Sequence, residues 1–349
     1  MRLTKHRNLG DNEPVYIIAE MSANHAGSLE KAKEIIRAAK GAGADCVKIQ
    51  TYTADTLTLN SNKDDFKIKG GLWNGETLYD LYKRASLPWE WHAELKKEAD
   101  AIGIDFFSTP YDSTAVDFLE KLGVEFYKIA SFEIVDIPLV KKIAQTGKPI
   151  LMSTGMATKE EIQEAVDTIR TAGNNNIALL KCSSAYPAES AEMNLATIAD
   201  LREKFGDVVV GFSDHSTEDV SAIIAVSLGA KIVEKHFCIS RDDKSADSAF
   251  SLDKNDFARL VKNIRETEAA LGKVSYGPTK QEMKSLAFRK SIYACRDIKK
   301  SEIFTEENIK VVRPSYGLHP RYFDRIIGKK AKQDIRFAEP IKEGDVDGF

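Results

Sequence analysis

Eight short apolar runs, each followed by a polar residue that could take part in chemistry, constrain the fold of this chain most strongly. The runs are residues 15–19 before Glu20, 46–47 before Lys48, 106–107 before Ser108, 126–127 before Lys128, 150–152 before Ser153, 177–180 before Lys181, 208–210 before Ser213 and 232–233 before Glu234. Strands of a parallel barrel are buried on both sides and read as continuous apolar sequence, and their carboxyl ends carry the active site. We therefore predict a (β/α)8 TIM barrel whose polar strand ends share one pocket.

Amphipathic segments alternate with these runs from residue 15 to about residue 271. In residues 29–42, apolar side chains recur at three- and four-residue steps among Lys and Glu, which predicts a helix. Further helices are predicted at 89–102, 113–122, 138–145, 159–172, 195–205, 218–228 and 254–271. A glycine closely follows each of those seven (Gly103, Gly123, Gly147, Gly173, Gly206, Gly229 and Gly272). Glycine readily adopts the left-handed conformation that ends many helices, so this punctuation supports repeated βα units.

Length and composition set the class of protein. A barrel of about 250 residues leaves room in a chain of 349 for one small extra domain. The formal net charge of −3 provides no basic surface for nucleic acid or an anionic membrane, although a small anionic substrate remains possible. We expect neither a membrane span nor a signal peptide, because no apolar stretch is long enough. Four widely spaced cysteines without a CxxC motif indicate free thiols and a cytoplasmic protein.

The carboxyl-terminal part of the chain has a different pattern. We assign residues 1–272 to the barrel, 273–288 to a polar linker that contains Gly277 and Pro278, and 289–349 to a second domain. Residues 291–294 and 309–312 are predicted to be short strands. A domain of about 60 residues has a marginal core, so docking to another surface would stabilise it.

One predicted connection, residues 51–76, is unusually long and contains a stretch with aromatic residues from Phe66 to Gly75. Long loops at the carboxyl end of a barrel often cover or shape the pocket. We interpret this segment as a substrate-specific lid, and the alternative is a variable surface loop.

Two histidines end the last two predicted strands. His215 follows the seventh strand and His236 ends the eighth, so both imidazoles should face one rim and could bind the same metal ion. Two histidines alone are a weak signal, because histidine also occurs as a hydrogen-bonded core residue. A two-nitrogen site would leave positions open to water and substrate oxygens, as a Lewis-acid metal requires.

Ammonium and hydroxyl groups gather at the same strand ends. The set is Lys48, Lys128, Ser131, Ser153, Ser183 and Ser213, and it suits a phosphate together with a carboxylate. Each residue alone could be a surface ion-pair partner or a turn residue, but that explanation fits the whole set poorly. Glu20, Gln50, Glu133 and Asp247 add acceptors for sugar hydroxyls, and the carboxylates could move protons. Tyr186 could stack on a sugar or be buried in its loop, and His25 could bind phosphate or cap a helix.

Six segments at these positions resemble motifs of the sialic acid synthase family in their order. They are residues 17–25 (IIAEMSANH), 47–50 (VKIQ), 127–131 (YKIAS), 153–156 (STGM), 211–215 (GFSDH) and 234–236 (EKH). The tail, including residues 289–293 and 312–314, resembles the antifreeze-like, or SAF, domain of that family. Within the family, residues 49–59, 69–73, 78–82 and 88–92 are most similar to those of pseudaminic acid synthases. Two departures are Phe212 and the pair Ser184-Ala185, and the latter makes contacts beside the phosphate site less secure.

The resemblance implies an activity and roles for residues. Phosphoenolpyruvate would condense with an open-chain acetamido sugar, here 2,4-diacetamido-2,4,6-trideoxy-altrose, to give a nonulosonic acid and phosphate. His215 and His236 would bind a divalent metal ion (Mn, Co or Mg). Phosphoenolpyruvate would contact Lys48, Lys128, Ser131, Ser153, Ser183, Tyr186 and Ser213, and the sugar would contact Glu20, Gln50, Glu133, Tyr186, Asp247 and Arg313. Arg313 would enter the site of the partner subunit in a domain-swapped homodimer.

Other functions fit parts of the same pattern. The sugar could instead be of the N-acetylmannosamine type, as in N-acetylneuraminate or legionaminate synthases. A class I aldolase would use Lys48 or Lys128 to form a Schiff base. A non-catalytic carbohydrate- or ice-binding protein would use the tail alone, and the complete set of strand-end residues argues against that function.

Overall fold

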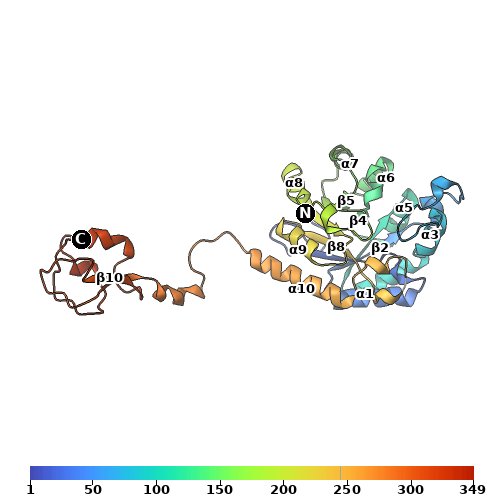
Figure 1. Cartoon of the computed structure of the whole chain (residues 1–349). Coiled ribbons are helices and arrows are strands. Elements are labelled where there is room, and N and C mark those ends of the chain that lie inside the picture. The colour runs from blue at the N-terminus through green and yellow to red at the C-terminus, as the bar shows by residue number, and fades with distance from the viewer. Residues whose placement is uncertain (244) are drawn as a thin grey trace. The chain divides into compact units, whose positions relative to one another are not determined.

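Eight parallel strands close into a barrel in sequence order, which confirms the predicted TIM-like fold (Figure 1). The computed structural model describes residues 1–243 and 245–349. The strands are β1 Tyr16–Glu20, β2 Cys46–Thr51, β3 Asp105–Pro110, β4 Tyr127–Ile129, β5 Ile150–Ser153, β6 Ile177–Cys182, β7 Val209–Asp214 and β8 Ile232–His236. β8 pairs with β1 in parallel register, with His236 beside Glu20, and this pairing closes the barrel.

Helices cover the outside of the barrel. They are α1 Leu29–Gly41, α4 His92–Ile102, α5 Ser113–Leu122, α6 Ile137–Ala144, α7 Lys159–Thr171, α8 Thr197–Lys204, α9 Val220–Ser227 and α10 Lys254–Leu271, whereas α2 Ala54–Leu57 and α3 Leu78–Ala85 belong to the connection between β2 and α4. Their apolar faces pack on the outward side chains of the strands, as Ile35, Ile36 and Val47 do in one of the core clusters. This burial removes apolar surface from water and is the main stabilising term of the fold.

The inside of the barrel changes character along its length. Successive strand residues face opposite sides of the sheet, so every second residue points inward. Tyr16 and Ile18 of β1 lie in the interior core with Leu3 and Leu9 from the amino-terminal segment. Glu20, the next inward residue of β1, is buried at the carboxyl end. The interior is therefore apolar at one end and carries ionisable groups at the other.

Two local expectations were incomplete. The connection after β2 is not a loop throughout. It includes α2 and the 3-10 turn η2 Asp64–Phe66, and α3 begins just after it. The predicted left-handed glycine is present after most helices, for example at Gly103 and Gly123, but Gly206 does not adopt it. α8 ends at Lys204 with Phe205 as its cap, which leaves Gly206 inside the following turn.

Residues Lys273–Phe349 form a separate unit. Its strands β9 Ser291–Ala294 and β10 Ile309–Val312 lie where short strands were predicted, and they pair antiparallel. Shorter elements are η8 Glu282–Phe288, η9 Pro320–Tyr322, α11 Phe323–Ile326 and η10 Glu343–Asp345. Ile292, Phe304, Ile326 and Ile341 belong to its own buried core. The unit therefore has the small independent core expected of the tail.

Two further features concern the cysteines and the helices of the described residues. Cys46, Cys182, Cys238 and Cys295 are free thiols. None of the helices formed by the described residues combines the length and apolar character needed to cross a lipid bilayer.

Candidate active site

A cavity of about 540 Å³ lies at the carboxyl ends of the barrel strands. Six of the eight polar residues that follow the apolar runs line it: Glu20, Lys48, Lys128, Ser153, Ser213 and Glu234. Ser108 and Lys181 do not, so the prediction of eight shared ends was wrong for these two. Ser108 instead bonds to Thr51, and Lys181 donates to the carbonyl of Cys182. Strand alternation explains the difference, because Phe107 and Leu180 face inward and their neighbours therefore face outward.

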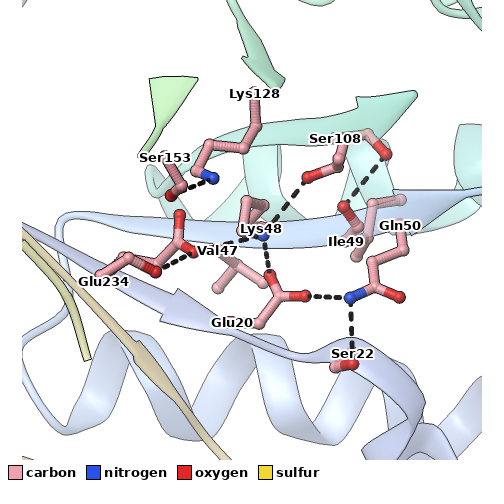
Figure 2. A network of polar contacts seen from close by, with 12 residues as sticks. Glu20, Ser22, Val47, Lys48, Ile49, Gln50, Ser108, Lys128, Ser153 and Glu234 are labelled. Carbon is pink, nitrogen blue, oxygen red and sulfur yellow. Dashed lines mark hydrogen bonds and ion pairs between the residues drawn. The ribbon is translucent and has the colours of Figure 1, made fainter. Parts of the chain in front are cut away.

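Lys48 lies between two buried carboxylates on the floor of the cavity (Figure 2). Its Nζ is 3.0 Å from Glu20 Oε2, 3.4 Å from Glu234 Oε1 and 3.2 Å from Thr109 Oγ1. Glu20 also accepts a 3.0 Å hydrogen bond from Gln50 Nε2. Burial lowers the pKa of Lys48, but the two carboxylates raise it above its ordinary value, so the ammonium group stays charged.

Hydroxyl and amide donors surround the second buried lysine. Lys128 Nζ donates to Ser153 Oγ at 2.6 Å, which places a cation and a hydroxyl together (Figure 2). The Ser131 hydroxyl accepts a 3.2 Å hydrogen bond from the backbone N–H of Gly155. A Cβ at Gly155 would collide with the side chains of Ser131 and Ser184, so only glycine permits this close approach. This group of donors has the composition that a phosphate or carboxylate requires.

Two carboxyl groups in the cavity have pKa values near neutrality. Burial raises the pKa of Glu20 to about 7, against the opposing effect of Lys48. Burial also raises the pKa of Glu133 to about 7, with Lys128 opposing it. Oε2 of Glu133 and Oε2 of Glu20 are both buried without a hydrogen-bond partner, but Glu20 Oε2 is ion-paired with Lys48 at 3.0 Å and Glu20 Oε1 accepts from Gln50, whereas Glu133 Oε2 has neither kind of contact. Glu133 is therefore the carboxyl better placed to exchange a proton with a bound molecule.

His215 and His236 come together as the strand positions predicted, with ring centroids 5.3 Å apart. His215 Nδ1 donates to the carbonyl of Ser183 at 2.9 Å, which leaves Nε2 as the nitrogen available to a ligand. Burial lowers the pKa of His215, but the neighbouring Cys182 raises it above its ordinary value. His236 Nδ1 is buried without a partner. Burial, followed by the neighbouring His215, holds the pKa of His236 well below its ordinary value, so this imidazole is neutral.

This donor set fits a divalent metal ion bound by two imidazoles. Among residues 1–243 and 245–349, no cluster of three or more His, Cys, Asp or Glu side chains has the geometry of a metal site. A site built here would therefore keep several positions for oxygens of water or substrate. The free Oε2 of Glu234, buried in the same cavity, adds negative charge that favours a cation.

Aromatic rings connect the histidines to the segment after β2. Tyr186 lies 4.3 Å from the His215 ring, and Phe250 lies 5.0 Å from the His236 ring. Trp73 reaches both of these aromatic residues, at 6.4 and 6.5 Å between ring centroids. Part of the predicted lid thus lines the cavity, as a substrate-specific lid would.

Of the remaining predicted residues, some line the cavity and others do not. Asp247 lines the cavity and accepts hydrogen bonds from the Ser22 hydroxyl and the backbone N–H of Ala23. Ser183 is not a lining residue, because its carbonyl holds His215 and its neighbour Ser184 faces the cavity. His25 is also outside the lining, and its Nδ1 accepts from the Gly27 N–H, which favours the capping role over phosphate binding.

Sequence reasoning missed several lining residues. Glu234 ended an apolar run but was not assigned a role, although its carboxylate contacts Lys48 and accepts from Ser213 Oγ. Tyr52 and Tyr111, whose rings are 5.2 Å apart, were not noticed at all. Glu234 was correctly predicted to share the pocket as one of the eight strand ends, and only its role was missed.

A second buried lysine network faces outward from the same strands. Lys235 Nζ is 2.6 Å from Asp214 Oδ2 and also donates to Ser216 Oγ at 2.9 Å and to the carbonyl of Glu218 at 2.7 Å. Asp214 accepts in addition from the Ser216 N–H and from the Ser221 hydroxyl. Every charged group in this network is satisfied by the protein, so it holds the β7 and β8 ends in place.

Comparison with known proteins agrees with these features. The NeuB family model matches residues 35–276, and the SAF domain model matches residues 289–347. The chain belongs to the NeuB family. This family assignment confirms the resemblance that the motifs indicated.

Two curated relatives and one solved structure show how far the NeuB likeness extends. Pseudaminic acid synthase from Campylobacter jejuni subsp. jejuni is 48% identical over 97% of this chain and 98% of the relative. Pseudaminic acid synthase from Helicobacter pylori is 44% identical over 96% and 98%. The crystal structure of N-acetylneuraminic acid synthetase from Leptospira borgpetersenii is 30% identical, with a TM-score of 0.72 over 82% of this chain and 96% of that one. The likeness therefore covers both units.

Proposed function

We propose that this protein is a pseudaminic acid synthase, a transferase that condenses phosphoenolpyruvate with 2,4-diacetamido-2,4,6-trideoxy-altrose. The single observation that supports this most is the cavity itself, which combines an ammonium and hydroxyl side, a two-histidine side and near-neutral carboxyl groups. The two curated relatives bear the name pseudaminic acid synthase, which favours this sugar over the N-acetylmannosamine type used by N-acetylneuraminate or legionaminate synthases.

In the proposed reaction, Lys48, Lys128, Ser131, Ser153 and Ser213 bind the phosphate and carboxylate of phosphoenolpyruvate. Lys128 with Ser153 would supply charge and a hydroxyl to one anionic group, since their atoms are already 2.6 Å apart. Ser184 rather than Ser183 faces the cavity and would be the hydroxyl available from that turn. Tyr186, whose ring is tilted against that of His215, would lie between the two substrates.

His215 and His236 would hold a divalent ion, Mn, Co or Mg. When bound, such an ion supplies a Lewis acid that polarises the aldehyde oxygen of the sugar. Gln50 and Asp247 would orient the sugar hydroxyls, and Glu20 would be held in place by Lys48. The site residues thus divide between anion binding, metal binding and sugar orientation.

The proposed reaction forms a carbon–carbon bond, adds water and breaks a C–O bond. Carbon 3 of phosphoenolpyruvate forms a bond with the aldehyde carbon, whose oxygen takes up a proton. Water adds to carbon 2, and a carboxylate accepts its proton. Glu133 is our candidate because its Oε2 is unpartnered, and Glu20 is the alternative. The tetrahedral phosphate ester then breaks its C–O bond and releases inorganic phosphate.

We propose further that Arg313 completes the site of a partner subunit in a domain-swapped homodimer. Arg313 follows β10 in the second unit. Turnover by a mixture of Arg313→Ala and Lys48→Met chains should exceed that of either variant alone, because a mixed dimer has one site with both residues. Equal inactivity of the mixture would contradict this arrangement.

One specific observation favours a rival reaction, a class I aldolase. Burial lowers the pKa of Lys128, which would make it a better amine nucleophile. Incubation with pyruvate and borohydride distinguishes the two reactions by mass spectrometry. A covalent adduct on Lys128 would support the aldolase, and its absence, with phosphate release from phosphoenolpyruvate, would support the synthase.

The experiment that tests the proposed function compares sugars. Phosphate release is measured with phosphoenolpyruvate and the diacetamido altrose sugar, with N-acetylmannosamine and with the mannose-configured diacetamido analogue. We expect clear preference for the altrose sugar. Preference for N-acetylmannosamine would overturn the pseudaminate assignment while leaving the family intact.

A further inference from the structure

One side of the cavity is apolar, and it is formed by the segment after β2. This segment contributes the aliphatic side chains of Leu57, Ile68, Leu78, Leu81 and Ala85, which we call the apolar wall, and also the rings of Tyr52, Tyr82 and Trp73, the last of which contacts Tyr186 and Phe250 beside the histidines. The strand ends contribute the carboxylates, lysines and serines described above. The cavity therefore has a polar side and an apolar side that come from different parts of the chain.

The apolar wall is held in a defined shape by its own backbone. Ile68 exchanges two 2.9 Å backbone hydrogen bonds with the stretch 75–76, which closes the turn that carries Trp73. The Thr77 side chain caps α3, where Leu78 and Leu81 lie. The edge-on contact of Trp73 with Phe250 ties this turn to the barrel end. The wall is thus a built surface of the cavity.

A polyhydroxylated chain bound in this cavity would meet very different partners on its two sides. Each sugar hydroxyl loses hydrogen bonds to water on binding and must find replacements. Aliphatic side chains such as Leu57, Leu78 and Leu81 offer none, so a hydroxyl placed against them would be unsatisfied. A methyl group has no such requirement and gains from the contact.

The two ends of an open-chain sugar have fixed places in this account. The aldehyde at carbon 1 must reach the side with His215 and His236, and carbon 6 is the far end of the chain. Acetamido groups carry an N–H and a carbonyl beside their methyl group, so they suit the polar strand ends. Carbon 6 of the proposed substrate bears no oxygen, and it alone is an apolar chain end.

We propose that the apolar wall receives the carbon 6 methyl group of the sugar and selects against sugars with a hydroxyl there. This inference rests on the proposed function and names the part of the substrate that the segment recognises. An apolar pocket rejects an added hydroxyl only moderately, by about 10²-fold. The wall should therefore bias the choice of sugar by about that factor.

The test uses two sugars that differ only at carbon 6, the 6-deoxy diacetamido altrose and its 6-hydroxy counterpart. We expect kcat/KM for the 6-hydroxy sugar to be about 10²-fold lower, with the KM for phosphoenolpyruvate unchanged. Equal kcat/KM values would overturn the inference and leave the proposed function standing. No turnover of either sugar would overturn the proposed function and this inference together.

Variants then locate the preference in the chain. Leu78→Asn places hydrogen-bonding groups in the wall. It should reduce the ratio of kcat/KM for the 6-deoxy sugar to kcat/KM for the 6-hydroxy sugar about tenfold. Leu59→Asn is the matched control, because Leu59 lies on the same segment but is 68% exposed and outside the lining. Leu57→Asn repeats the test should Leu78→Asn not fold. An unchanged ratio in both wall variants would overturn the assignment to the wall.

Discussion

Two buried lysine networks on the same barrel differ in whether the protein satisfies them. Lys48 faces inward between Glu20 and Glu234, and Glu234 Oε2 and nearby Glu133 Oε2 have no hydrogen-bond partner. Lys235 faces outward, and every donor and acceptor that it and Asp214 carry is paired within the protein. Unsatisfied buried polar atoms cost free energy, so we propose that a bound molecule satisfies those inside the cavity.

The largest effect on activity is expected from the inward lysine. Lys48→Met removes the charge that faces the proposed phosphoenolpyruvate site, so kcat/KM should fall by about 10³-fold. Steady-state phosphate release measures the loss, and circular dichroism checks that the variant is folded. A fall of less than tenfold would contradict the role given to the inward network.

The outward lysine should affect stability instead. Lys235→Met leaves the Asp214 carboxylate buried without its cation and should lower the free energy of unfolding by about 3–5 kcal/mol. Urea denaturation measures this, with Lys262→Met as control, because Lys262 forms an exposed pair worth about 0.5 kcal/mol. kcat/KM of folded Lys235→Met should stay within about tenfold of wild type. A loss as large as that of Lys48→Met would remove the distinction between the networks.

The pH dependence tests the unpartnered carboxyl of Glu133. Its pKa is raised to about 7, so the wild-type kcat/KM should rise with pH through about 7 as the carboxylate forms. Glu133→Gln should lose this limb and be about 10²-fold slower at high pH.

The same raised pKa has a consequence for stability. Because the folded protein binds this proton more tightly than the unfolded chain, Glu133 should contribute less stability as pH rises from about 4.5 to about 7. Glu133→Gln should therefore gain stability relative to wild type across that range.

The matched variant for the kinetic prediction is Glu20→Gln. If Glu20→Gln, and not Glu133→Gln, abolishes the rise of kcat/KM with pH, then Glu20 is the carboxylate that accepts the proton.

A pair of serine variants should give the smallest effects. Ser153 accepts from Lys128 inside the cavity, and Ser221 donates to Asp214 outside it. Ser153→Ala should raise the KM for phosphoenolpyruvate about fivefold, equivalent to about 1 kcal/mol. Ser221→Ala should lower the free energy of unfolding by about 1.5 kcal/mol without changing KM. A raised KM in Ser221→Ala, together with a loss of stability but no change in KM in Ser153→Ala, would contradict the distinction between the inward and outward networks.

Much of the barrel could be predicted because its signal is local. Apolar runs and amphipathic segments specify strands and helices residue by residue, and the inward polar ends of β1, β2, β4 and β5 followed directly. Ser108 and Lys181 failed because a polar residue at a strand end faces inward or outward according to its parity, which a run of apolar letters does not give. Counting in twos from an inward residue would have excluded them.

The apolar wall could not have been predicted in the same way. Leu57, Ile68 and Leu78 are far apart in a segment without strand periodicity, and α3 was not recognised. Their shared surface depends on how this segment packs against the barrel end, which is tertiary information. The length of the connection located the segment, and the structure identified which of its side chains meet the cavity.

The central claim is that the cavity joins phosphoenolpyruvate to the sugar with cleavage of the C–O bond. The most direct test supplies phosphoenolpyruvate labelled with heavy oxygen at the bridging position, together with the diacetamido altrose sugar, and analyses the products by mass spectrometry. We predict that the label is recovered in inorganic phosphate and that the sugar product gains three carbons. Unlabelled phosphate, or no condensed product, would contradict the account.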